Sequence, residues 1–170
     1  MPNYLSASAV ISTCGSYRYL LRRTWDQTLP SYVLGMLNPS TADAEVDDPT
    51  ITRSVRRAAS LGHGSLVVWN IYAFRATDPA KLRQAHDPVG PDNARWIRTA
   101  LMECSSGGGT AVVGWGGNAV DTKTVAAACA VAVELGVNLL CLGITKDGHP
   151  RHPLYVSYEA VLQPWRFAGG

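Results

Sequence analysis

Four short runs of the chain are almost wholly apolar, and each gives way abruptly to polar residues. These runs cover residues 32–37, 65–72, 110–115 and 137–142. An unbroken apolar run of this length is typical of a strand that is buried on both faces of a sheet. The pattern therefore predicts four strands of a parallel sheet.

Stretches with apolar residues at helical spacing separate these runs. We predict helices over residues 49–61, 93–104 and 119–135, and a short helix after the last polar loop. Asp48, Pro49 and Thr50 have the form of a helix N-cap followed by a proline in the first turn. Strands that alternate with helices imply right-handed crossovers and a sheet covered by helices.

The N-terminal residues 5–25 follow a different pattern, in which Tyr17, Tyr19 and Leu21 alternate with Arg18, Leu20 and Arg22. This alternation predicts a strand or hairpin at the edge of the sheet. At 170 residues the chain fits one domain. We therefore predict a single α/β domain over residues 1–170: a three-layer α/β/α sandwich around a central, mainly parallel four-stranded sheet, with an N-terminal edge hairpin.

Polar residues gather where the predicted strands end. The first strand stops at Asn38 and Pro39, and the others stop near Asn70, Trp115 and Gly143. Ligands bind outside the carboxyl ends of the strands in open α/β sheets, so these loops are expected to surround one crevice. The alternative for the Asn38 loop is a capped turn that leads into a helix.

Composition and charge narrow the cellular setting of the protein but do not identify the class of its binding partner. The formal charge of +2 is compatible with nucleic acid without requiring it, so any phosphate-binding surface must be local. Two arginine clusters, 18–23 and 53–57, are either such surfaces or solvated faces of a hairpin and a helix. No run is long enough to span a bilayer and the N-terminus has no signal-like pattern, so we expect a soluble, cytoplasmic protein.

The four cysteines, Cys14, Cys104, Cys129 and Cys141, are far apart and form no CxxC pair, so we expect reduced core residues.

Five motifs together closely resemble a bacterial and phage family known only as a domain of unknown function. They are Asn38-Pro39-Ser40-Thr41-Ala42-Asp43, Asp48-Pro49-Thr50, Trp69-Asn70 with Arg75-Ala76-Thr77-Asp78-Pro79, Gly114-Trp115-Gly116 and Arg151-His152-Pro153-Leu154-Tyr155. The strand before Asn38-Pro39 and the later His152-Pro153-Leu154 more distantly resemble the two active-site motifs of the uracil-DNA glycosylase superfamily.

The glycosylase resemblance implies roles for particular residues. Asn38 would orient a water molecule at the anomeric carbon of the sugar, and His152, or alternatively His149, would contact a carbonyl of the base. Cleavage of an N-glycosidic bond passes through an oxocarbenium-like state, to which Asp43 could add negative charge. The chain departs from the superfamily in having Gly35 three residues before Asn38, and it has no cysteine set for an iron–sulfur cluster.

The remaining candidates for substrate binding are polar, basic or aromatic residues of the same loops. Hydroxyl, guanidinium and ammonium groups could bind a nucleic-acid backbone, and Trp69 or Trp115 could stack on a flipped base. A salt bridge from Arg75 to Asp78 or Asp87 is the structural alternative for that arginine. The candidate binding residues are Ser40, Thr41, Asn70, Arg75, Trp115, Lys146, Arg151 and Tyr155.

Three classes of function remain open. The first is a glycosylase-like hydrolase acting on a base in DNA or in a nucleotide. The second is a metal-dependent nucleotide or phosphoester hydrolase that uses the acidic residues 43–48. The third is a binding module for nucleic acid or nucleotide without catalysis. No Walker loop and no GxGxxG motif is present, so we expect no cofactor, and we expect no metal.

Overall fold

The computed structural model describes residues 1–40, 42–117 and 121–167, which form a mixed α/β structure around one sheet. Four parallel strands occupy its centre: β3 (Ser31–Met36), β4 (Ser65–Asn70), β5 (Thr110–Val113) and β6 (Leu139–Cys141). These are the four predicted strands. An N-terminal hairpin, β1 (Ser6–Ile11) and β2 (Arg18–Thr24), pairs antiparallel with β4 at one edge, as predicted.

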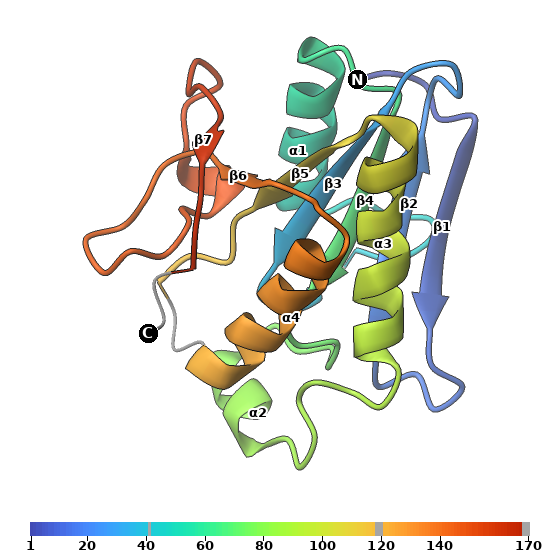
Figure 1. The fold of residues 1–170 in the computed structure, drawn as a ribbon. Coiled ribbons are helices and arrows are strands. Elements are labelled where there is room, and N and C mark those ends of the chain that lie inside the picture. Colours follow the sequence, from blue (N-terminus) through green and yellow to red (C-terminus); the bar gives the residue numbers. More distant parts are fainter. Residues whose placement is uncertain (41, 118–120, 168–170) are drawn as a thin grey trace.

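The sheet has seven strands in the order β1-β2-β4-β3-β5-β6-β7, one more than the predicted four and edge hairpin (Figure 1). The additional strand, β7 (Gln163–Pro164), pairs antiparallel with β6. Two residues are too few for an alternating pattern, so β7 leaves no signal in the sequence. The backbone N–H of the buried Trp165 donates to the Leu139 carbonyl and holds the strand in place.

Helices cover both faces of the sheet. The helix α1 (Pro49–Ser60) lies on one face, and α3 (Asn93–Gly107) and α4 (Thr122–Glu134) lie on the other (Figure 1). All three were predicted from helical spacing, although the expected start of α4 at Ala119 lies outside the described residues. A short helix, α2 (Pro79–Gln84), was not predicted; Asp78 caps it by accepting from the Ala80 N–H.

The prediction of a C-terminal helix is wrong. Between residues 145 and 167 the structure has a 3-10 turn, η1 (Pro153–Tyr155), and the short strand β7, and no α-helix. The carbonyl groups that a continuing helix would bond within itself, those of Val156, Ser157 and Tyr158, instead accept hydrogen bonds from arginines of α1. Tertiary bonds have replaced the local helical ones.

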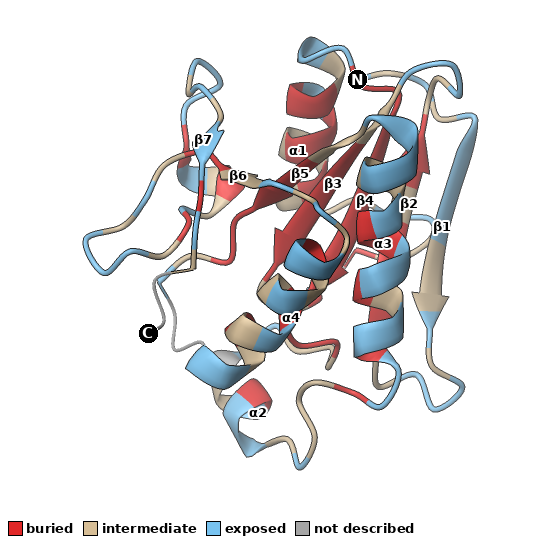
Figure 2. Cartoon of the chain, in the orientation of Figure 1, coloured by how far each residue is buried: buried red, intermediate tan, exposed pale blue. Residues whose placement is uncertain are grey.

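Alternation along the strands divides the core into two apolar layers. Tyr32 and Leu34 of β3 pack toward α1, and Val33 between them packs toward α3 and α4. The central strands are buried along their length and β1 is more exposed (Figure 2). The cysteines are free, and Cys14 is exposed, so the expectation of a core position is wrong for it. Among the described residues no helix is long and apolar enough to cross a membrane.

Gly35 of β3 leaves room for the indole ring of Trp69, its partner in the neighbouring strand β4. A Cβ atom at this position would lie 2.4 Å from Cζ2 of Trp69, whose side chain is almost fully buried. A residue larger than glycine would have to push an indole ring out of a close-packed core.

Replacement of Gly35 by alanine is therefore expected to lower the free energy of unfolding by about 1–3 kcal/mol, the usual range for overpacking a core. Urea unfolding followed by tryptophan fluorescence measures this change. Gly107→Ala is the matched control, because a Cβ there would meet no atom within 4 Å. Equal stability of the two variants would show that the Trp69 contact does not constrain position 35.

Candidate active site

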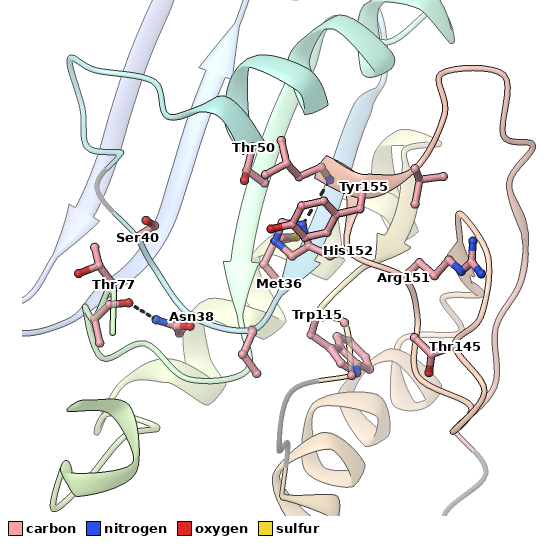
Figure 3. A pocket seen from close by; sticks show the side chains of 16 residues that line it. Met36, Asn38, Ser40, Thr50, Thr77, Trp115, Thr145, Arg151, His152 and Tyr155 are labelled. Atoms are coloured by element: carbon pink, nitrogen blue, oxygen red, sulfur yellow. Dashed lines mark hydrogen bonds between the residues drawn. The ribbon is translucent and has the colours of Figure 1, made fainter. Parts of the chain in front are cut away.

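The carboxyl ends of the four parallel strands open on one cavity of about 610 Å³. Each of the four strands contributes lining residues at or after its carboxyl end. They are Met36, Leu37, Asn38 and Ser40 from β3 and its loop, Ala76 and Thr77 after β4, residues 115–117 after β5, and Thr145, Arg151, His152 and residues 154–156 after β6. Figure 3 shows these side chains around the opening. The predicted convergence of the strand ends is thus present in the structure.

The side-chain amide of Asn38 is held in one orientation. Its nitrogen donates to the Ala76 carbonyl at 2.6 Å and to the Pro39 carbonyl at 3.1 Å (Figure 3). Both partners are acceptors only, so the NH₂ group must face them. The amide oxygen has no partner in the part of the chain that the structure describes, and it can only accept a hydrogen bond.

The imidazole of His152 is also fixed through one of its polar atoms. Its Nδ1 accepts a hydrogen bond from the Leu154 backbone N–H at 3.3 Å, which caps η1. Burial lowers the pKa of His152 below its ordinary value of 6.5, partly opposed by the nearby Asp48 carboxylate. The neutral ring therefore dominates at pH 7. With Nδ1 as acceptor, its proton resides on Nε2, the ring's free donor.

Two arginines of α1 hold the segment that carries His152. Arg53 donates to the Pro153 carbonyl at 3.2 Å and to the Val156 carbonyl at 2.6 Å. Arg57 is buried and donates to the Ser157 carbonyl at 2.7 Å, with longer bonds to Val156 and Tyr158. Two members of the second arginine cluster therefore have a structural task that the sequence did not indicate.

The loop after β5 packs closely against the same segment. A Cβ atom at Gly114 would lie 2.8 Å from Cδ of Pro153, so glycine is needed for this approach. Gly116 has a φ of +77°, and its N–H donates to the Pro150 carbonyl at 2.9 Å. The Gly-Trp-Gly motif thus brings the third strand end against the loop that follows the fourth.

Three of the four acidic residues after Asn38, all of them aspartates, are bound to structural partners. Asp47 accepts from the buried Arg23 at 2.7 Å, and Asp48 caps α1 through the Ile51 N–H. The carboxylate of Asp43 accepts from the N–H groups of Glu45 and Val46, and these bonds hold its pKa below the ordinary value. Among the described residues no three His, Cys, Asp or Glu side chains are grouped to hold a metal ion.

The three side chains of the first arginine cluster are bound within the protein, and only Arg22 is partly exposed. Arg18 is buried and donates to the Ala42 carbonyl, and Arg23 donates to the Asp43 carbonyl at 2.6 Å. Arg22 forms an ion pair with Glu103 of α3. These side chains tie the loop after β3, and the helix α3, to the edge hairpin.

Six of the sequence-predicted site residues line the cavity: Asn38, Ser40, Trp115, Arg151, His152 and Tyr155. Five others, counting the alternative histidine, are not among its lining residues: Asp43, Asn70, Arg75, Lys146 and His149. Thr41 lies outside the described residues.

Two of the residues outside the cavity have roles that can be described. Asn70 is buried, and neither of its amide atoms bonds to another described residue. Arg75 donates to the Gly15 carbonyl at 3.3 Å, rather than pairing with Asp78 or Asp87.

The aromatic residues of the site differ in what they offer a ligand. Trp69 and Trp115 are each 1% exposed and belong to the core, and Trp115 packs edge-on against Trp165. Tyr155 is 81% exposed at the rim, with its ring centroid 5.4 Å from that of His152. Tyr155 is therefore the ring with an open face. Thr50, Thr77 and Thr145 also line the cavity, and the sequence analysis did not propose them as site residues. Their place in the sequence, just after a helix cap or in a loop after a strand, was the one signal that could have indicated them.

A family model described as "Protein of unknown function (DUF1643)" matches residues 18–154. The match covers well over half of the chain, and the chain therefore belongs to this family. Membership of a family of unknown function is thus confirmed. No curated protein and no solved structure matches the chain.

The pKa of His152 should lie below 6.5, because burial disfavours the imidazolium. The neutral form then adds stability above pH 6.5 that is lost as the pH falls toward the folded-state pKa. Titration of its ring protons by NMR measures this pKa. Asp48→Asn keeps an N-cap side chain but removes the charge that favours protonation, so the pKa should fall further. A pKa above 6.5 would contradict the burial of the ring.

Arg57→Met keeps the aliphatic stem but removes the donors to three carbonyl groups. We expect a loss of about 2–4 kcal/mol in the free energy of unfolding, because hydrogen bonds from a charged group are strong and three of them are lost together. Denaturant unfolding checks the value. Arg56→Met, one position earlier and exposed, is the control and should change stability little. A similar loss in both variants would refute the structural role of Arg57.

Proposed function

We propose that this member of the family binds a nucleobase in the cavity, as part of DNA or of a nucleotide, and hydrolyses its N-glycosidic bond. One observation carries the proposal. The cavity is lined both by Asn38, whose side chain has only an acceptor atom without a partner among the described residues, and by His152, whose ring has only a donor atom without one.

The two groups suit the two ends of the breaking bond. The Asn38 oxygen can hold a water molecule by accepting a hydrogen bond from it, at the face of the sugar opposite the base. The water oxygen bonds to the anomeric carbon while the C–N bond breaks, and the electron pair of that bond stays on the base. The attacking water loses a proton to solvent, and the departing base takes up a proton from solvent. His152 Nε2–H can donate to a carbonyl of the departing base, where negative charge develops.

The surrounding residues fit such a ligand. The exposed ring of Tyr155 can stack on a base, and the exposed guanidinium of Arg151 can bind a phosphate. Asn38 follows the first parallel strand and His152 follows the last, which is the arrangement that the glycosylase resemblance implies. The three-layer sandwich of that superfamily is the architecture we propose, and Asp43 has no part in the proposed chemistry.

A second candidate is a binding module without catalysis, and a specific observation favours it. No carboxylate is among the described residues that line the cavity. An amide cannot accept a proton as a carboxylate can, so the water would be oriented without being activated by a general base. The same side chains would then recognise a base or nucleotide without cleaving it.

Oligonucleotides that carry uracil, hypoxanthine, hydroxymethylated or glucosylated bases distinguish the two candidates. With chelator present throughout, the wild-type protein should release one of these bases, scored as alkali-labile sites. Asn38→Ala and His152→Ala should each lower the rate by about 10²–10³-fold, the usual cost of removing one group that stabilises the transition state.

His149→Ala is the matched control, because His149 is not among the cavity-lining residues, and it should retain the wild-type rate. Binding without base release would select the binding module. Release that occurs in a parallel reaction without chelator, and not with it, would replace both candidates with a metal-dependent hydrolase.

A further inference from the structure

A second depression lies on the other side of η1 from the cavity. This outer groove has a volume of about 420 Å³ and is lined by Asp47, Thr52, Arg53, Arg56, Leu154 and Tyr158, together with Pro49. Leu154 lines both the outer groove and the cavity. The first turns of α1 border both depressions, with Thr50 in the cavity and Thr52 in the groove. The two depressions are therefore neighbours across a single side chain.

The outer groove carries positive charge that is not neutralised by a free carboxylate within the groove. Arg56 is exposed and forms no ion pair or hydrogen bond with the described residues. The acidic member of the groove, Asp47, is already bound by the buried Arg23 at 2.7 Å and by the Tyr4 hydroxyl. The second arginine, Arg53, therefore adds to the charge of Arg56 without a free carboxylate to offset it.

An aromatic side chain in the groove is held against a fixed cation. The Arg53 guanidinium lies 4.2 Å from the ring centroid of Tyr158, and its Nε and one terminal nitrogen are bound to backbone carbonyls. Tyr158 is still 45% exposed. A guanidinium fixed in this way loses little freedom when a ligand binds, so the pair is preorganised. One terminal nitrogen of Arg53 has no partner among the described residues.

We propose that the outer groove binds the phosphodiester backbone and an adjacent base of a single nucleic-acid strand whose target base occupies the cavity. Arg56 and the remaining N–H groups of Arg53 contact the phosphate, and the open face of Tyr158 stacks on the base. Basic side chains beside exposed aromatic rings are the usual means of binding single strands. This inference rests on the proposed function for the target base, and it makes a polynucleotide, rather than a free nucleotide, the substrate.

Fluorescence anisotropy with a labelled single-stranded 12-mer and with a labelled mononucleotide tests the inference. Arg56→Gln should weaken binding of the 12-mer at low salt by about 5–10-fold, and should reduce the slope of log K against log salt by about 0.7, the value for one lost phosphate contact. Tyr158→Leu should weaken it by about 5-fold or more through loss of stacking. Binding of the mononucleotide should not change in either variant.

Arg95→Gln is the matched control, since Arg95 is an exposed arginine on α3, which covers the opposite face of the sheet. Equal 12-mer affinity of Arg56→Gln and Arg95→Gln would overturn the inference, as would binding of the mononucleotide alone. An acidic peptide that binds with the same dependence on Arg56 would also overturn it, in favour of a protein partner. If no base is released but the 12-mer depends on Arg56 and Tyr158, the groove stands and the proposed hydrolysis fails.

Discussion

The candidate site depends on the hydrogen bonds by which α1 holds the backbone of residues 153–158. Arg53 and Arg57 both point their guanidinium groups into carbonyl oxygens of this segment, and Arg57 does so while buried. A buried charge without a carboxylate partner is costly unless its N–H groups are well satisfied. Four backbone carbonyls accept hydrogen bonds from these two side chains, and only Nε of Arg57 is buried without a partner among the described residues, so the charge and the loop stabilise each other. His152 immediately precedes this segment, so the hydrogen bonds that hold the segment also fix the position of His152.

Much of the frame could be read from the sequence because its signals are local. Apolar runs mark β3 to β6, and Asp48-Pro49-Thr50 marks the start of α1. The alternation of residues 17–22 is enough to indicate the edge hairpin. Each of these features depends on side chains that are neighbours along the chain. Patterns of periodicity and capping are defined by such neighbours, so the sequence alone indicates them.

The features that the sequence did not reveal are made by distant residues. Arg57 and Ser157 are far apart in the chain, so no spacing rule could indicate that their bond would replace a C-terminal helix. The same holds for Arg23, whose contact with Asp47 turns an apparent metal-binding string into a structural loop. Trp115 looks like a stacking platform at a strand end, yet Trp165 packs against it from the C-terminal segment. Which polar residues reach the cavity is decided by such contacts.

The cavity presents one fixed acceptor, from Asn38, and one fixed donor, from His152, because the opposite atom of each side chain is bound to the backbone. The most direct test of this account is the tautomer of His152, determined from two-bond nitrogen–proton correlations in ¹⁵N-labelled protein at neutral pH. The account predicts a neutral ring protonated on Nε2, with Nδ1 showing the shift of an unprotonated acceptor. A ring protonated on Nδ1, or an averaged tautomer mixture typical of a free imidazole, would contradict it.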